Sequence, residues 1–342
     1  MNRNHQRDSH CIRIPDSRRR MLCGLAALTA LAPYSVFSDS FILPPPDIDL
    51  VGVTTTTTTT YEDTLLDVAR RHGLGYREIV RANPDVDPWL PGEGAQVVLP
   101  TRFILPPVER KGIVLNIPEM RLYYFPEPAD NEMPVVITHP ISIGRMDWQT
   151  PIGLTRVVRK VRNPSWYPPE SIRTEHAADG RPLPKVVPPG PDNPLGEYAL
   201  SLGLPGYLIH GTNKPAGVGM RVTHGCIRMY PEDIEIMFND VPVNTPVRII
   251  NQPYKIGWIA NTLFLEVHPP LDEDEELRQR EMTAVTELLV HATRGRIVPV
   301  DWAKAREIFD SASGIPMAMS RLERRQSSLI SDIRQNPPSI SP

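Results

Sequence analysis

The sequence predicts a mainly β protein, a β-sandwich or an open barrel, with a small α+β module before it and helices after it. Residues 111–251 consist mostly of short apolar runs separated by turn residues, which is the pattern of an all-β domain. Residues 61–100 show helical spacing, and residues 272–314 show it again. The 39 prolines among 342 residues disfavour a protein built of long helices.

The expected β domain has its clearest strands in its first half, with the sequences GIVLNI, MRLYYF, PVVITHPISIG and LTRVVRKV. Residues 116–125 favour a hairpin, because two strand-like runs flank a turn. Residues 245–250 predict the last strand of this domain. The proline-rich residues 163–196 are too long for a simple connection, so we expect a structured loop over a functional site. The alternative is a linker between subdomains.

The stretch before this domain divides into a linker and a small module. Residues 39–53 contain three consecutive prolines and predict the linker. In residues 54–101 we expect a strand, two short helices and a second strand, with glycine and Asn-Pro as helix stops. The run Thr54 to Thr60 fits either a low-complexity linker or the first strand, because threonine is β-branched.

Residues 252–316 are expected to form a hairpin and then helices. An apolar stripe indicates a first helical segment that packs on the protein. Asp301 is placed to cap a second helix, which we expect to end near Gly314. The polar residues 317–342 predict a disordered tail.

Residues 1–38 have the features of a signal peptide. Arg18, Arg19 and Arg20 precede an apolar stretch that is too short for a comfortable membrane span, and small residues follow it. The arginine run also resembles a twin-arginine signal, so export by the Sec or the Tat route stays open. An uncleaved anchor is the alternative. After cleavage no remaining segment is apolar enough to span a membrane.

Charge and cysteine content narrow the classes of partner. The net charge of −3 at pH 7 shows no basic surplus, so we expect no nucleic-acid partner. Of the three cysteines, Cys11 and Cys23 lie in the expected signal peptide. A mature chain would keep one thiol, at Cys226, and a single thiol in an exported protein favours a reactive role.

The candidate catalytic residues lie between residues 207 and 229. His210 ends a short apolar run, and a loop with several glycines leads from it to Cys226. A thiol is mostly protonated at neutral pH, with a pKa of roughly 8.5, and a neighbouring imidazole accepts its proton. Backbone N–H groups at Gly225 and Cys226 are candidates to stabilise an oxyanion. Thr223 and His224 are candidates to orient the site.

Plainer interpretations of the same residues exist. A single cysteine is often an inert small apolar residue, and a single histidine after a strand is often a core residue. His210, His224 and Cys226 would also supply three ligands to a zinc ion, although no paired cysteine or histidine motif accompanies them. We expect no metal and no organic cofactor.

The segments HGTN and THGCIRM resemble the signature of the L,D-transpeptidases, whose catalytic domain is of the YkuD type. The segments ISIG, TPIG, NPSW and PPGPDNPLG also resemble that family. The resemblance implies that Cys226 is the nucleophile and His210 its base. The supporting residues would be Gly225, His224, Thr223 and Gly211. Candidate substrate-binding residues are Arg221, Arg228, Trp166, Tyr167 and Asn193; for the two arginines a structural ion pair is the alternative.

Residues 54–101 resemble a LysM module, which implies glycan binding; a small helical spacer is the alternative. The whole layout resembles the Gram-negative group that attaches Braun lipoprotein to peptidoglycan. The resemblance therefore implies a periplasmic enzyme that forms a cysteine thioester with a tetrapeptide stem and passes it to an amine of a lipoprotein or of a neighbouring stem. The alternatives are a hydrolase or lipoprotein-releasing amidase on the same fold, and a wall-binding protein without activity.

Overall fold

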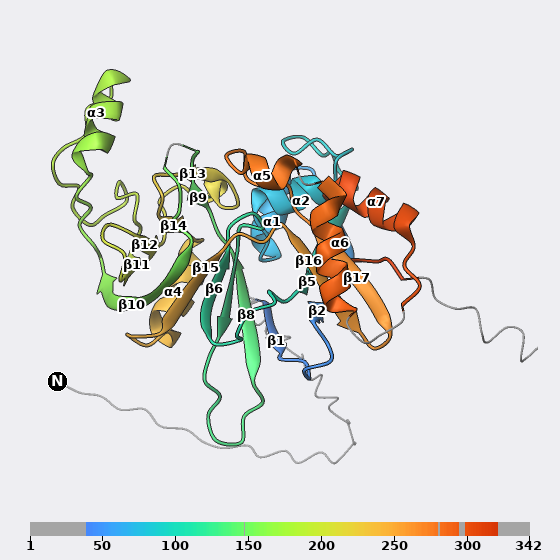
Figure 1. Cartoon of the computed structure of the whole chain (residues 1–342). Coiled ribbons are helices and arrows are strands. Elements are labelled where there is room, and N and C mark those ends of the chain that lie inside the picture. The colour runs from blue at the N-terminus through green and yellow to red at the C-terminus, as the bar shows by residue number, and fades with distance from the viewer. Residues whose placement is uncertain (1–38, 147, 280, 294–297, 321–342) are drawn as a thin grey trace, which may run out of the picture. The chain divides into compact units, whose positions relative to one another are not determined.

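The computed structural model describes residues 39–146, 148–279, 281–293 and 298–320 (Figure 1). The expected signal peptide, residues 1–38, and residues 321–342 of the expected tail lie outside the described residues. No helix in the described part of the chain is both long and apolar enough to cross a bilayer.

A nine-stranded sheet forms the largest part of the fold, in the order β1-β8-β7-β6-β15-β10-β11-β12-β14. Most neighbours are antiparallel, but the pairs β6–β15 and β12–β14 are parallel. The mainly β class predicted from the sequence is confirmed. The bounds are β1 Asp39–Ile42, β6 Gly112–Asn116, β7 Arg121–Phe125, β8 Val135–Pro140, β10 Gly153–Arg162, β11 Tyr198–Leu202, β12 Leu208–His210, β14 Ile227–Arg228 and β15 Pro246–Ile250.

The predicted hairpin of residues 116–125 is the β6–β7 pair, in which Asn116 lies opposite Arg121. Apolar residues of these strands and of β10 to β15 pack with α4, Pro231–Asp240, into a buried core. A separate pair, β9 Ile143–Gly144 and β13 Arg221–Thr223, lies parallel beside the main sheet. This pair carries the backbone that leads into Cys226.

The first module has the expected order of elements. Strand β3, Thr55–Thr58, pairs with β4, Gln96–Leu99, so the threonine run contains a strand. Helix α1, Leu65–Arg71, begins at a capping box in which Thr64 and Asp67 bond each other's backbone N–H. Helix α2 is Tyr76–Ala82. Strands β2, Leu50–Gly52, and β5, Arg102–Ile104, pair at the base of the module.

This module shares a hydrophobic core with the large sheet. Buried side chains of α1, α2 and β4 pack with Val114, Tyr123 and Val136 from β6, β7 and β8. The buried guanidinium of Arg121 bonds the carboxylate of Glu78 on α2, with its Nε 2.7 Å from Oε1. The module is therefore fixed to the sheet, because both apolar packing and a buried ion pair join them.

The C-terminal part also packs on the sheet. Strands β16, Tyr254–Ile259, and β17, Thr262–Val267, form the second predicted hairpin. Helices α5, Glu275–Gln279, α6, Glu281–Ala292, and α7, Trp302–Ser311, follow, and Asp301 caps α7 by accepting from the N–H of Lys304. The predicted tail is wrong at its start, because β18, Met317–Ala318, pairs with β17 and the next residue, Met319, is buried.

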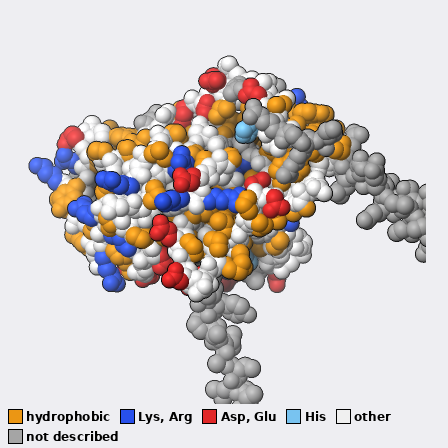
Figure 2. Space-filling view, turned by 60° about the horizontal axis from the view of Figure 1, so that its bottom comes forward, with side chains coloured by type: hydrophobic (Ala, Val, Ile, Leu, Met, Phe, Trp, Pro, Cys, Tyr) orange, Lys and Arg blue, Asp and Glu red, His pale blue; other side chains and the backbone are white. Residues whose placement is uncertain are grey.

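Charge is unevenly spread over the surface. Figure 2 shows Lys and Arg side chains gathered toward one side of the face that it draws. Exposed arginines on β10 are Arg156, Arg159 and Arg162. The surface is therefore locally positive along β10, although the net charge of the chain is −3.

Candidate active site

His210 and Cys226 lie on neighbouring parallel strands. In the register of β12 and β14, His210 is opposite Arg228, and Cys226 directly precedes β14. Side chains two residues apart along a strand share a face, so Cys226, Arg228 and His210 point to the same side of the sheet. The Sγ of Cys226 lies 3.5 Å from the carbonyl oxygen of Gly206, and the N–H of Leu208 donates to the sulfur. The sulfur of Cys226 is thus held against the strand that carries His210.

The buried imidazole of His210 is oriented by the backbone. Its Nδ1 lies 2.6 Å from the carbonyl oxygen of Gly211. A carbonyl only accepts hydrogen bonds, so in the neutral ring Nδ1 carries the proton. The carbonyl of Leu195 is a second backbone partner of the ring. Gly211, predicted as a supporting residue, contacts the ring through its carbonyl group.

The electrostatics favour a neutral pair at rest. Burial, with a smaller effect of the Arg228 charge, lowers the pKa of His210 to about 4. Burial raises the pKa of the half-buried Cys226 thiol, although the Leu208 N–H and Arg228 act in the opposite direction. Both shifts favour a neutral thiol and a neutral imidazole near neutral pH.

Two threonine hydroxyls fix the peptide groups on either side of Cys226. Thr223 donates through Oγ1 to the carbonyl of Cys226 at 2.6 Å. Thr150, which the sequence analysis did not single out, donates to the carbonyl of Gly225 at 2.9 Å. Gly225 has φ of 95°, a conformation in which a side chain is strained, and a Cβ there would lie 2.9 Å from the Tyr207 ring. Hydrogen bonds thus hold the backbone on both sides of Cys226.

His224 faces away from this pair, toward the proline-rich segment. Its Nε2 lies 3.2 Å from Glu175 Oε2 and 3.2 Å from Arg145 Nη2. Arg145 and Glu175 also bond each other at 2.5 Å. Glu175 belongs to α3, Glu170–Ala178, a helix that the sequence analysis missed. This contact joins the expected loop over the site to the residue two before Cys226.

The two candidate arginines differ. Arg221 is bonded by both oxygens of Glu273, at 2.7 and 2.8 Å, so the alternative of a structural ion pair describes it. No carboxylate among the described residues forms an ion pair with Arg228, and its buried Nε lacks a hydrogen-bond partner there. Arg228 is therefore a cation available to an anionic group at the site.

The remaining predicted residues lie in the proline-rich segment. Asn193 does not line a groove. It is fully buried, and its side chain donates to the carbonyl of Pro164 and accepts from the N–H of Leu195, so it holds the segment together. Trp166 pairs with Val187 through the backbone, and the side chain of Tyr167 is exposed.

Within the described residues, His210, His224 and Cys226 do not bring their ligand atoms together. The group that does is Glu119, Glu266 and His268, whose ligand atoms lie within 4.8 Å of one another. The Nζ of Lys255 lies 2.9 Å from Glu119 and 2.7 Å from Glu266, so an ammonium already pairs with both carboxylates. That cluster is an ionic junction, and no metal is assigned to it.

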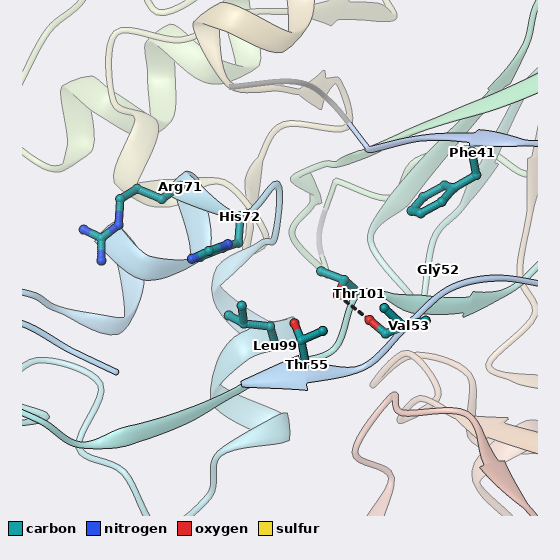
Figure 3. Close-up of a pocket in the computed structure, with 8 residues that line it drawn as sticks. All are labelled: Phe41, Gly52, Val53, Thr55, Arg71, His72, Leu99 and Thr101. Atoms are coloured by element: carbon teal, nitrogen blue, oxygen red, sulfur yellow. Dashed lines mark hydrogen bonds between the residues drawn. The ribbon is translucent and has the colours of Figure 1, made fainter. Parts of the chain in front are cut away.

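A cavity of about 480 Å³ lies elsewhere (Figure 3). It is lined by the first module and the strands before it, including Phe41, Thr55 and His72. A second cavity, of about 230 Å³, is lined by Gly144, Thr150 and Arg221. It adjoins the turn at Gly225, because Thr150 bonds that glycine.

Comparison with known proteins gives a consistent result. The family described as YkuD, L,D-transpeptidase catalytic domain, matches residues 110–249. The chain is 39% identical to Probable L,D-transpeptidase ErfK/SrfK of Escherichia coli (strain K12) over 90% of this chain and 99% of that one. It is 40% identical to Probable L,D-transpeptidase YbiS of the same strain over 74% of this chain and 82% of that one. The solved L,D-transpeptidase 3 from Mycobacterium tuberculosis is 22% identical over 46% of this chain and 67% of that one, with a TM-score of 0.30.

Proposed function

We propose, since the chain belongs to the L,D-transpeptidase family, that Cys226 forms a thioester with a peptidoglycan stem peptide and that an amine then takes the acyl group. The placement of the two side chains carries this proposal. The sulfur of Cys226 is held against β12, and His210 on that strand has Nδ1 bonded to the carbonyl of Gly211, which makes Nε2 the candidate base. A thiol beside an oriented imidazole is the arrangement that nucleophilic catalysis requires.

The first half-reaction transfers the acyl group to the enzyme. Nε2 of His210 takes the thiol proton while Sγ of Cys226 adds to the carbonyl carbon of the third residue of a tetrapeptide stem, a diamino acid. The carbonyl electron pair moves to the oxygen, where backbone N–H groups at Gly225 and Cys226 stabilise it. The C–N bond then breaks, and His210 returns the proton to the departing D-Ala amine. A thioester remains on Cys226.

The second half-reaction releases the product. An acceptor amine adds to the thioester carbonyl and gives its proton to Nε2 of His210. The C–S bond breaks, and the Cys226 thiolate takes the proton back from His210. The overall layout favours the lysine amine of an outer-membrane lipoprotein as acceptor, and the amine of a neighbouring stem is the second candidate.

We assign to Arg228 the binding of the stem peptide. Its guanidinium is largely enclosed, has no ion-pair partner among the described residues, and lies on the face shared with His210 and Cys226. A stem carboxylate would supply the missing acceptor. Peptidoglycan stems carry carboxylates close to the amide that is cleaved, so this pairing would place the scissile carbonyl at Cys226.

Analysis of the reaction products distinguishes an amine acceptor from water. The mature protein is incubated with a disaccharide tetrapeptide, alone and with an added lysine-bearing peptide. A transpeptidase releases D-Ala and forms an amide to the added amine, whereas a hydrolase yields a disaccharide tripeptide in both reactions. Release of no D-Ala, from protein in which the thiol of Cys226 remains titratable, would reject both and favour a wall-binding protein.

We also propose that the first module binds glycan and that the enzyme works in the periplasm. Tyr61 and Trp89 support glycan binding, because their side chains are 83% and 56% exposed on loops of the module, and aromatic faces stack on sugars. Binding to purified peptidoglycan sacculi should weaken in Tyr61→Ala and Trp89→Ala, with the exposed Tyr167→Ala as control. Fractionation of the native host would test the location.

A further inference from the structure

The turn before Cys226 is held by a residue from a distant part of the chain. Thr150 is buried, with 7% of its surface exposed, and its hydroxyl lies between two backbone groups. It donates to the carbonyl of Gly225 at 2.9 Å and accepts from the N–H of Gly144 at 3.3 Å. Both hydrogen-bonding roles of the hydroxyl are therefore used.

The carbonyl that Thr150 holds belongs to the peptide group of Cys226. In a trans peptide the C=O and the N–H lie in one plane and point in opposite directions, and the described residues contain no cis peptide. Fixing the carbonyl of Gly225 therefore fixes the direction of the Cys226 N–H. A hydrogen bond to the carbonyl also polarises the amide and strengthens the N–H as a donor.

The surrounding backbone restricts the orientation of this peptide group. A Cβ on Gly144 would lie 3.0 Å from the Cα of Gly225 and 1.8 Å from the carbonyl oxygen of Trp148. Thr223 holds the next carbonyl, that of Cys226, at 2.6 Å. Backbone atoms thus enclose the peptide group on the Gly144 side. The hydrogen bond from Thr150 fixes the direction in which the N–H of Cys226 points.

We propose that Thr150 is a positioning residue that aims the N–H of Cys226 at the oxyanion. This inference rests on the proposed function, in which Cys226 is the nucleophile. When Sγ adds to a carbonyl carbon, the C–S bond forms and the carbonyl electron pair moves onto oxygen. The Cys226 N–H then bonds that oxygen until the C–N bond breaks and the amine leaves with the His210 proton. Thr150 touches neither the substrate nor the sulfur in this scheme.

Two reactions of the same thiol separate this role from a general structural one. Acylation by a carbapenem passes through an oxyanion, whereas alkylation by iodoacetamide displaces iodide at a saturated carbon and forms none. In T150V the saturating rate of acylation should fall by about 10- to 100-fold, somewhat less than the loss of an oxyanion donor outright. Alkylation and its pH profile should stay within about twofold of the unchanged protein, which is within the spread of ordinary surface substitutions.

Two further variants serve as controls. T150S keeps the hydroxyl and should acylate within about threefold of the unchanged protein, since a neutral hydrogen bond retained costs little. T245V removes a matched hydroxyl, because Thr245 is 9% exposed and donates to the carbonyl of Pro242 at 2.8 Å, away from Cys226. It should acylate normally. If T150V does not fold, T150A compared with T150S gives the same contrast.

The outcomes are distinct. Equal losses of acylation and alkylation in T150V would overturn the positioning role, and so would acylation of T150V within about twofold of the unchanged protein. Failure of the unchanged protein to be acylated, with its thiol reactive toward iodoacetamide, would instead reject the proposed nucleophilic function and this inference with it.

Discussion

Gly75 and Gly219 pack backbone against backbone. A Cβ on Gly219 would lie 2.5 Å from the Cα of Gly75 and 2.3 Å from the nitrogen of Tyr76. The N–H of Tyr76 donates to the carbonyl of Val218 at 3.0 Å. The start of α2 therefore rests directly on the loop that joins His210 to Cys226. The first module therefore supports the loop between these two residues.

Gly219→Ala should loosen this contact. Residue 219 has φ of 83°, so alanine is strained there, and its Cβ meets backbone that cannot move aside cheaply. We expect a loss of about 1–3 kcal/mol in the free energy of unfolding and slower acylation of Cys226. Gly92→Ala is the matched control, with the same φ of 83° and nothing within 4 Å. Equal effects of the two substitutions in urea denaturation would show that the contact between the module and the loop contributes nothing.

Lys255 holds a buried ionic junction between the C-terminal hairpin and the sheet. Lys255→Met would leave Glu119 and Glu266 buried without their common cation. Removing one partner of a buried pair typically costs about 3–5 kcal/mol, and urea denaturation would measure it. Lys304→Met, which breaks an exposed pair with Glu307, should change stability by less than about 1 kcal/mol. A loss of similar size in both variants would contradict the account.

The same junction predicts sensitivity to acid. Burial opposes ionisation of Glu119, but Lys255 and His268 hold its pKa below the ordinary 4.5. A depressed carboxyl pKa contributes stability that is present above the unfolded value and lost as the pH falls through the folded one. Stability should therefore decline below about pH 4.5, and Lys255→Met should remove this part of the decline. If Lys255→Met lost stability at low pH as steeply as the unchanged protein, other groups would cause the acid sensitivity.

The thiol of Cys226 should stay protonated near neutral pH. Because the pKa of His210 is lowered to about 4 and that of Cys226 is raised, we expect no thiolate–imidazolium pair near neutral pH. Alkylation by iodoacetamide should be slow at pH 5 to 7 and rise only in the alkaline range. A plateau of high reactivity between pH 5 and 7 would indicate a preformed ion pair, and the proposed proton transfer during attack would then be wrong.

Arg228 should matter for the substrate more than for the fold. If it binds a stem carboxylate, Arg228→Gln loses a charge-assisted hydrogen bond worth about 1.5–3 kcal/mol, which is about 10- to 150-fold in kcat/KM for a tetrapeptide. Arg181→Gln, an exposed residue paired with Asp179, is the control. The alternative, a structural role, predicts that melting temperature falls while kcat/KM of the folded protein stays unchanged.

Local patterns predicted much of the fold. The hairpin of residues 116–125 and the helix cap at Asp301 follow from turn and capping chemistry, which depends on a few adjacent residues. Helix α3 was missed, although Pro168 and Pro169 before it and Gly180 after it are typical helix boundaries. Its sequence has no clear apolar stripe, because Ile172 is its one buried residue in the described structure.

The site was predictable only in part. The sequence placed His210 and Cys226 together through one motif, but Thr150 bonds Gly225 from 75 residues away. Glu175 reaches His224 from a helix that was not expected. Such contacts depend on how elements pack, and one sequence does not specify them. Asn193 shows the converse error, because its place in a proline-rich loop that resembles the family's suggested a substrate contact, whereas its side chain bonds the backbone of that loop.

The mass of the intact protein after incubation with a carbapenem tests the central claim most directly. If Cys226 is the nucleophile, the mass should rise by one carbapenem, and peptide mapping should place the adduct on Cys226. The Cys226→Ala variant should show no increase, and His210→Gln should acylate about 10²- to 10⁴-fold more slowly, the usual contribution of a general base. An adduct of equal yield in Cys226→Ala, or none in folded protein with a free thiol, would contradict the account.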